Sequence, residues 1–406
     1  MKVENCRLCG VGRLSEPKLV FPPTPLANEF LSNPCPQELF PLEVCVCNSC
    51  EHYQLNESID PARLFTTYSY AAGHSAANIE HFEQAASQHV EKFSLTAGMK
   101  VLDIASNDGT LLDAFKKHGM TILGIDPAQN LASDANSRGI PTLIDFFSLS
   151  KALELKRSHG QFDLVTANNV FAHVPDLQDF AKGVKTVLAP EGVFSFEVSY
   201  FLDVCEKTLF DTIYHEHSSY HTLTPLISFF NTLGMKVFDV DHLPNHGGSV
   251  RVYVCNAYAE IGMVEGSSGL LASLLKREKN ITEEVVFLKD RISQLGDRLN
   301  SELKKFKCDN KTIAIFGVPA KATTLMYAFG LTGSIIDFAI DGSPLKQGMY
   351  TPGTHLQILP PSAIAERKPE VLLILAWNFA DTIIQRHAEF KGDWIIPLPE
   401  LKIINS

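Results

Sequence analysis

The sequence predicts an α/β protein in which two Rossmann-like units follow a small cysteine-rich unit. Three observations carry this prediction: two cysteine pairs within the first 50 residues, a strand–turn–helix pattern that begins at Lys100, and a second such pattern that begins at Thr312. A chain of 406 residues is long enough for two or three domains, each with its own hydrophobic core. We expect the three units to span residues 1–65, 66–265 and 266–406.

The first unit contains the pairs Cys6-x₂-Cys9 and Cys47-x₂-Cys50 on either side of a proline-rich stretch. Two such pairs supply four thiolates for a tetrahedral Zn²⁺ site, and a set of four cysteines without an open position is typical of a structural site. Cys45 could replace Cys47, and buried reduced thiols without a metal are the alternative. The segment is too short to build a large core alone.

Composition excludes several classes of protein. The chain has 35 Lys and Arg against 46 Asp and Glu, a net charge of −11, which argues against broad binding to nucleic acid. No apolar run approaches the roughly 20 residues that cross a bilayer, and no export signal is visible, so we expect a cytoplasmic protein that does not bind membranes.

Hydrophobic periodicity predicts the remaining elements. The first Rossmann-like unit is expected to have helices at 78–93 and 110–115 and strands at 100–105, 121–125, 162–167 and 192–198. One long linking helix is expected within 269–307, with an apolar stripe that packs on a neighbouring domain. The last unit then has strands at 312–317, 335–340 and 371–376.

The turn after the first of these strands differs from a dinucleotide-binding fingerprint because it contains one glycine. Acidic and polar residues dominate it, which suits S-adenosylmethionine (SAM), a ligand with a sulfonium and no phosphate. Asp126 ends the next strand, where a carboxylate can accept bonds from ribose hydroxyls. A strand-end Asp that only caps a helix is the alternative. The residues expected to bind SAM are Asp103, Ser106, Asn107, Asp108, Gly109, Asp126 and Asn168.

Polar side chains also follow later strands of this unit, at the edge where open α/β sheets bind ligands. Asn169 and His173 are expected near the substrate, although His173 could instead pack on a neighbour from a helix face. Asp145 and Phe146 could hold the edge and face of an adenine.

The densest polar cluster lies within residues 211–221. It includes Tyr214, Glu216 and His217, a set suited to proton abstraction, because histidine titrates near neutrality and a carboxylate or phenol can orient it. A second metal site and a solvated loop with incidental histidines are the alternatives.

Two further stretches are candidates to close the site. Tyr68 or Tyr70 could cover a pocket, and core packing is an equally good interpretation. Lys321, at the expected start of a helix in the last unit, is placed to meet a diphosphate, although a surface lysine is the default.

Together these residues resemble the three-domain, SAM-dependent sugar C-methyltransferases that act on carbon 3 of nucleotide-linked 4-keto-deoxysugars. The similarity extends over nearly the whole chain. The motifs that carry it are the two cysteine pairs, Ser106-Asn107-Asp108-Gly109-Thr110, Asn168 to Val174, Tyr214-His215-Glu216-His217, Gly317 to Lys321, Pro344 to Gly348, Pro352 to His355, and Ala376-Trp377-Asn378.

The resemblance implies a zinc-binding domain, a Rossmann-like SAM methyltransferase domain and a second Rossmann-like α/β domain. It implies that His217 is the base, that Tyr214 and Glu216 support it, and that either Tyr68 or Tyr70 reaches the substrate. One departure is Ala105, where such enzymes usually carry glycine.

The expected activity is methyl transfer from SAM to C3 of a nucleotide-diphosphate 4-keto-6-deoxy sugar, with thymidine as the expected base. A small nucleotide sugar is then the partner, and the sequence leaves the oligomeric state open. An O- or N-methyltransferase and a non-catalytic zinc-containing scaffold that binds a nucleotide are the alternative hypotheses.

Overall fold

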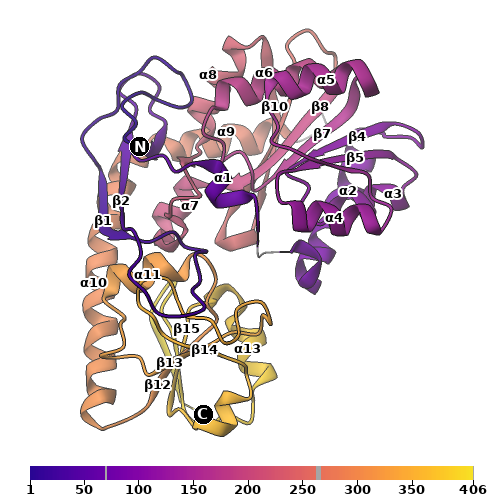
Figure 1. Ribbon diagram of the computed structural model, residues 1–406. Helices are drawn as coiled ribbons and strands as arrows, with labels where there is room; N and C mark the ends of the chain where they lie inside the picture. Colours follow the sequence, from indigo (N-terminus) through magenta and orange to yellow (C-terminus); the bar gives the residue numbers. More distant parts are fainter. Residues whose placement is uncertain (69–70, 262–266, 406) are drawn as a thin grey trace.

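The computed structural model describes residues 1–68, 71–261 and 267–405, and these residues form three β-sheets (Figure 1). The first sheet lies beside both of the others, so the N-terminal unit bridges them. Within the described ranges, none of the helices has both the length and the apolar character that crossing a membrane requires.

The first sheet has four antiparallel strands, and its last strand comes from the middle of the chain. The order is β1 (Leu19–Thr24), β2 (Phe40–Val46), β3 (Tyr53–Leu55) and β9 (Ser219–Tyr220). Short helices follow at α1 (Pro61–Phe65), which Asp60 caps, and at the 3₁₀ turn η1 (Ala72–His74).

The first sheet has no separate core. Apolar residues on β1, β2 and β3 pack in one cluster with the C-terminal domain, whereas Cys6, Leu8 and Cys47 join the core of the middle domain. The prediction that this short unit cannot bury a large core alone is confirmed.

The middle sheet has seven strands and is doubly wound, with helices on both faces. Its strands run in the order β10 (Met235–Leu243), β11 (Ser249–Asn256), β8 (Leu188–Ser199), β7 (Phe162–Asn168), β4 (Lys100–Ile104), β5 (Thr121–Asp126) and β6 (Thr142–Ile144). Strands β4 to β8 are parallel, and β11 pairs antiparallel with β8. Each strand predicted for this unit is present.

Helices cover both faces of this sheet. Figure 1 shows α2 and α3 on one side of it and α5 and α6 on the other. The helices are α2 (Ala76–Lys92), α3 (Thr110–Lys117), α4 (Gln129–Ser137), α5 (Leu149–His159), α6 (Leu177–Val187), α7 (Phe201–Glu206) and α8 (Leu223–Thr232), with 3₁₀ turns η2 (Phe210–Thr212) and η3 (Asn245–Gly247).

The prediction of one linking helix is wrong, because two helices occupy that stretch: α9 (Ser267–Glu278) and α10 (Ile281–Cys308). Glu278 explains the break. Its buried carboxylate accepts hydrogen bonds from the amides of Leu223 and Thr224 and from the hydroxyl of Tyr200, which fixes the end of α9 to the first turn of α8. The chain then turns away along the C-terminal domain.

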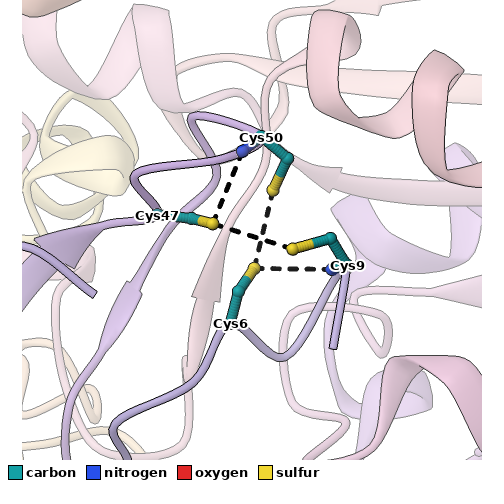
Figure 2. Close-up of side chains that lie close together, drawn as sticks. All are labelled: Cys6, Cys9, Cys47 and Cys50. Atoms are coloured by element: carbon teal, nitrogen blue, oxygen red, sulfur yellow. Dashed lines mark hydrogen bonds between the residues drawn. The ribbon is translucent and has the colours of Figure 1, made fainter. Parts of the chain in front are cut away.

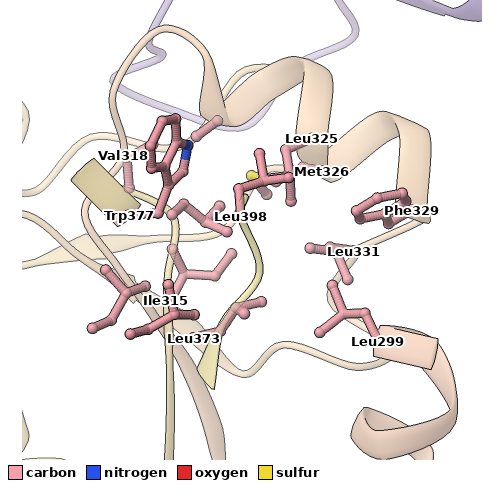
Figure 3. Packing of buried hydrophobic residues seen from close by; sticks show 14 of the residues in the cluster. Leu299, Ile315, Val318, Leu325, Met326, Phe329, Leu331, Leu373, Trp377 and Leu398 are labelled. Carbon is pink, nitrogen blue, oxygen red and sulfur yellow. The ribbon is translucent and has the colours of Figure 1, made fainter. Parts of the chain in front are cut away.

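The predicted apolar stripe of the linking helix is confirmed on α10. Leu288, Leu295, Leu299 and Leu303 are buried in the cluster that includes the C-terminal domain. In Figure 3 Leu299 lies beside Phe329 and Leu331 of that domain.

The third sheet has six strands in the order β14 (Ile358–Leu359), β13 (Phe338–Ile340), β12 (Ile313–Phe316), β15 (Val371–Ile374), β16 (Asp393–Ile396) and β17 (Lys402–Asn405). The first five are parallel. The strand predicted at 335–340 starts later, because the amides of Ile335 and Ile336 close a turn on Thr332. The helices are α11 (Ala322–Phe329), α12 (Ala363–Arg367) and α13 (Ala380–Arg386), with a 3₁₀ turn η4 (Trp377–Phe379).

Candidate functional site

Four cysteine sulfurs converge in the N-terminal unit (Figure 2). All four Sγ atoms lie within 4.8 Å of one another, with Cys6 to Cys50 at 3.6 Å and Cys9 to Cys47 at 3.7 Å. Four sulfurs at about 2.3 Å around a tetrahedral Zn²⁺ would be separated by about 3.8 Å. The cluster therefore has the dimensions of a closed zinc site.

The backbone around the sulfurs is arranged for thiolates. Amides of Cys9, Gly12, Ser49 and Cys50 donate to three of the sulfurs at 3.3–3.4 Å. Gly12 is needed at its position, since a Cβ there would lie 2.3 Å from the sulfur of Cys47. The four predicted residues form one group that could hold the ion, and the alternative use of Cys45 is wrong, because Cys45 lies on β2 outside this group.

The turn after β4 adopts a strained backbone, and Ala105, which replaces the glycine usual in the resembled family, is one of its two strained residues. Ala105 has φ 52° and Asn107 φ 53°, both in the left-handed region. Asp103, the penultimate residue of β4, is buried. Its carboxyl group accepts a hydrogen bond from the hydroxyl of Thr166 at 2.6 Å and therefore does not cap a helix. Burial raises the pKa of Asp103 to about 7.

Asp126 holds this turn from the neighbouring strand. Its Oδ2 accepts from the amide of Asn107 at 2.7 Å and its Oδ1 from the amide of Ala128 at 2.8 Å. Burial raises the pKa of Asp126, although these two bonds oppose the shift. Each carboxylate oxygen keeps a second lone pair for a ligand hydroxyl.

Asn107 and Asp108 have a role that the sequence did not indicate. Asn107 Oδ1 accepts from the amide of Ala72 at 2.9 Å, and Asp108 Oδ2 accepts from that of Gly73 at 2.8 Å. Both side chains therefore fasten η1 over the turn, and Asp108 also bonds Thr110 at the start of α3.

The residues present fit SAM. Ser106 Oγ is buried without a hydrogen-bond partner among the described residues. It packs directly against Gly124, because a Cβ on that residue would lie 2.4 Å from Ser106 Oγ. A bound polar ligand would satisfy this hydroxyl, and the buried carboxyl groups of Asp103 and Asp126 near the turn suit a cationic ligand. When bound, SAM supplies an electrophilic methyl group.

Replacing Ala105 by glycine is expected to stabilise the fold and to tighten SAM binding. A non-glycine residue in the left-handed region costs about 1–2 kcal/mol, and the added backbone entropy of glycine offsets about 0.4–1 kcal/mol. Thermal unfolding and calorimetric titration with SAM would measure both effects. Gly98→Ala, at another left-handed position far from the turn, should destabilise instead; a lowered melting temperature for Ala105→Gly would contradict the argument.

The turn after β7 follows the strand next to β4 and reaches the polar cluster of residues 211–221. Asn168 ends the strand beside Glu197 of β8, and Asn169, at φ 55°, donates its amide to the Glu197 carbonyl. His173 follows in a turn rather than on a helix, and its ring lies 4.8 Å from that of His217. Burial and the neighbouring His217 hold the pKa of His173 well below its usual value.

His217 is held in one orientation by its own loop. Its Nδ1 lies 2.7 Å from the carbonyl of Thr212, which can only accept, so Nδ1 carries the proton and Nε2 has the lone pair. The hydroxyl of Tyr214 lies 3.1 Å from Nε2. An imidazole prepared in this way can take a proton at Nε2.

Glu216 lies beside His217 and is bound from two distant segments. Its Oε2 accepts from the hydroxyl of Tyr68 at 3.1 Å, and its Oε1 accepts from Asn28 Nδ2 at 2.7 Å. Burial raises the pKa of Glu216 to about 7. Tyr68 is thus brought to the cluster, whereas Tyr70 lies outside the described residues.

The loop that carries these groups is buried, so its interpretation as a solvated loop is wrong. His215 Nε2 donates to the carbonyl of Pro41 and His221 Nε2 to that of Phe171, which directs both rings into packing contacts. Among the described residues, the four cysteines are the only group of three or more potential ligands with metal-binding spacing.

Lys321, which precedes α11 in the C-terminal domain, contacts the same loop at Asp211. Its ammonium is 3.8 Å from Asp211 and 3.8 Å from the ring centre of Trp377, whose indole N–H donates to Asp211 at 2.6 Å. Burial lowers the pKa of Lys321 and raises that of Asp211. Asp211 belongs to η2, which also includes Thr212, so Lys321 is connected to the segment that orients His217.

Three family models match successive parts of the chain. Residues 6–65 match "Putative zinc binding domain", residues 79–240 match "Methyltransferase domain", and residues 244–399 match "C-methyltransferase C-terminal domain".

Individual proteins match to different extents. C-methyltransferase NovU of Streptomyces niveus is 35% identical, over 100% of this chain and 97% of its own length. An ubiquinone biosynthesis O-methyltransferase of Coxiella burnetii is 21% identical over 39% of this chain and 73% of its own. The solved structure of magnesium protoporphyrin IX methyltransferase from Synechocystis PCC 6803 with bound SAM covers 44% of this chain and 79% of its own, with 11% identity and a TM-score of 0.34.

Proposed function

Since the chain belongs to the family of SAM-dependent C-methyltransferases with an N-terminal zinc-binding domain, we propose that it methylates C3 of a nucleotide-diphosphate 4-keto-6-deoxy sugar. Thymidine diphosphate is the proposed carrier. His217 is the proposed base, and Tyr214, Glu216 and Tyr68 surround the reacting part of the sugar.

The observation that carries this proposal is the fixed tautomer of His217. A carbon acid needs a base with its lone pair on a defined nitrogen, and the Thr212 carbonyl places that lone pair on Nε2, where the Tyr214 hydroxyl now lies and which a substrate C–H would approach. A C3–H bond next to a C4 ketone is acidic enough for an imidazole to break. The electron pair moves into an enolate, C3 becomes nucleophilic, and the proton stays on Nε2.

The surrounding groups support charge on the sugar oxygen. Once Nε2 of His217 has taken a proton it can donate to the Tyr214 oxygen, which leaves the Tyr214 hydroxyl able to donate to a developing oxyanion, and the Tyr68 hydroxyl is held by Glu216. His173, kept neutral by burial, adds no competing positive charge beside His217.

Lys321 supports a diphosphate-bearing substrate. Its ammonium forms no hydrogen bond within the described part of the chain, and its closest carboxylate oxygen, on Asp211, is 3.8 Å away. A buried cation in that state gains from an incoming anion, because burial has already lowered its pKa.

Lys321→Ala is expected to raise KM for the nucleotide sugar by roughly 10- to 100-fold, with a smaller fall in kcat, because a charge-assisted hydrogen bond contributes about 1.5–3 kcal/mol. Steady-state kinetics would separate the two constants. Lys311→Ala is the matched control. Lys311 precedes the first residue of β12, whereas Lys321 follows the last, and the ammonium of Lys311 pairs with Asp393, so its removal should leave KM unchanged. An unaltered KM in Lys321→Ala would exclude contact with the diphosphate.

The direct test is incubation of the protein with nucleotide-linked 4-keto-6-deoxy sugars in D₂O, with and without SAM. A new methyl group on C3, or deuterium at C3 without SAM, read by mass spectrometry and proton NMR, is the expected result. A methyl group on oxygen or nitrogen with no exchange at carbon would reject the carbon-acid chemistry, and no binding of SAM would favour a non-catalytic nucleotide-binding scaffold.

A further inference from the structure

A segment of the zinc-binding domain, residues 25–38 between β1 and β2, reaches both other domains; we call it the strap. On the C-terminal domain, Leu31 and Tyr350 exchange backbone hydrogen bonds of 3.1 and 2.7 Å. Gln37 accepts from the amide of Gly353 at 2.7 Å. Gly353, at φ 67°, permits this approach, since a Cβ there would lie 3.0 Å from Pro25.

The strap also contacts the loop of residues 211–221, which carries Glu216 and His217. Asn28 Nδ2 donates to Glu216 Oε1 at 2.7 Å, while the Tyr68 hydroxyl donates to Oε2 at 3.1 Å. The two donors therefore occupy different oxygens of one carboxylate. The backbone of the strap fixes the first donor, because the Ala27 carbonyl accepts from Thr323 and the Asn28 carbonyl accepts from Phe30.

We propose that Asn28 is a positioning residue for the reaction, through which the zinc-binding domain fixes the carboxyl group of Glu216 so that it can hold the Tyr68 hydroxyl. This proposal rests on the proposed function of the site. It gives the N-terminal domain a part in catalysis beyond stability, and it assigns no direct contact with substrate to Asn28.

The surroundings of Glu216 explain why a fixed donor matters. Burial raises the pKa of Glu216 to about 7, and the hydrogen bonds from Asn28 and Tyr68 oppose that shift. Other titratable or charged groups on the elements packed here are Tyr214, His215 and His217 on the same loop, Glu29 with its partner Arg63 at the strap, and His173 on the turn after β7. Without the amide of Asn28, the carboxyl group would be protonated over a wider pH range and free to rotate.

The first measurement needs no substrate. The full-length zinc-loaded protein, labelled with ¹³C at glutamate Cδ, is titrated by NMR, and the spectrum of Glu216→Gln identifies the Glu216 signal. Asn28→Leu is expected to raise the pKa of Glu216 by roughly one unit, and Asn28→Asp by more, because a second carboxylate adds repulsion. Glu29→Gln, the neighbouring strap residue paired with Arg63 on the surface, is the matched control and should leave it unchanged.

The second measurement is kinetic. Asn28→Leu is expected to lower kcat roughly tenfold and to move the acid limb of the pH profile upward with the NMR value, while SAM affinity stays constant. In the Glu216→Gln background the same substitution should have no further effect, since Asn28 acts through Glu216.

The outcomes separate the two proposals. If the wild type methylates no sugar yet the NMR value moves, the proposed function fails and the link from Asn28 to Glu216 stands. An unchanged pKa and kcat in Asn28→Leu, or additive losses in the double variant, would overturn the positioning role. If Asn28→Leu does not fold, the near-isosteric Asn28→Asp decides by the same criteria.

Discussion

His217→Asn is expected to lower kcat for C-methylation by roughly 10²- to 10⁴-fold, the range that a positioned general base contributes. The amide side chain can still hydrogen-bond, but it cannot take the proton that Nε2 accepts. Wash-in of deuterium at C3 should be lost in parallel, because both measurements depend on the same proton transfer. SAM affinity should remain, since the loop of His217 is separate from the turn that Asp126 holds.

The matched control is His159→Asn, an exposed histidine at the end of α5 that should leave every constant unchanged. Calorimetry with SAM distinguishes a catalytic defect from a folding defect in His217→Asn. Full turnover in this variant, with normal SAM binding, would show that another group removes the proton.

Cys9→Ser is expected to release zinc and to unfold the N-terminal unit, the largest effect on stability that we expect from one substitution. Structural zinc contributes about 10–16 kcal/mol in zinc-finger peptides, whereas ordinary substitutions cost about 0.5–3 kcal/mol. The unit cannot compensate, since its strands pack only as part of shared clusters. Activity should fall with the zinc, because the strap would lose its anchor beside Glu216.

Zinc content by mass spectrometry and thermal unfolding measure this outcome, and chelation of the wild type should reproduce it. Cys35→Ser, an exposed cysteine on the strap and outside the cluster, should retain one zinc ion per chain and a normal melting temperature. A Cys9→Ser protein with full zinc content would disprove the four-cysteine site.

The parts of the fold that local pattern determines could be predicted from sequence. Periodicity located four strands of the middle sheet, β4, β5, β7 and β8, because they alternate with turns and helices over short distances, whereas β6, β10 and β11 were not predicted. The cysteine pairs identified the zinc residues because a two-residue turn is enough to bring two sulfurs to one ion. Ala105 was recognised as unusual only through the resemblance, because such enzymes usually carry glycine there; that its backbone is left-handed, with φ 52°, is known from the structure alone.

Contacts between distant segments could not be predicted in this way. Asn28 lies in a proline-rich stretch without periodicity, and its partner Glu216 is in another domain. Likewise, nothing local indicated that Ser219 and Tyr220 would complete the first sheet, or that Glu278 would cap α8 and end α9. Each of these depends on the packing of three domains, which a single sequence does not encode in neighbouring residues.

Side-chain assignments at the ligand site were predictable only in part. The chemistry of residues 103–109 favoured SAM, but two of the polar side chains, Asn107 and Asp108, are engaged by the amides of Ala72 and Gly73. Spacing indicates which residues lie at the edge of a sheet, whereas the direction of each side chain depends on the segment that covers the edge.

The fourth strand of the first sheet, β9, has a practical consequence for protein engineering. Tyr53 pairs with Tyr220, and Gln54 with Ser219, so the N-terminal sheet is completed by residues from the middle of the gene. An exchange of the N-terminal module between homologous enzymes would therefore join mismatched halves of one sheet. A working chimera has to transplant residues around 214–221 together with residues 1–65, so the modules that recombine are discontinuous in the gene although each sheet is continuous in space.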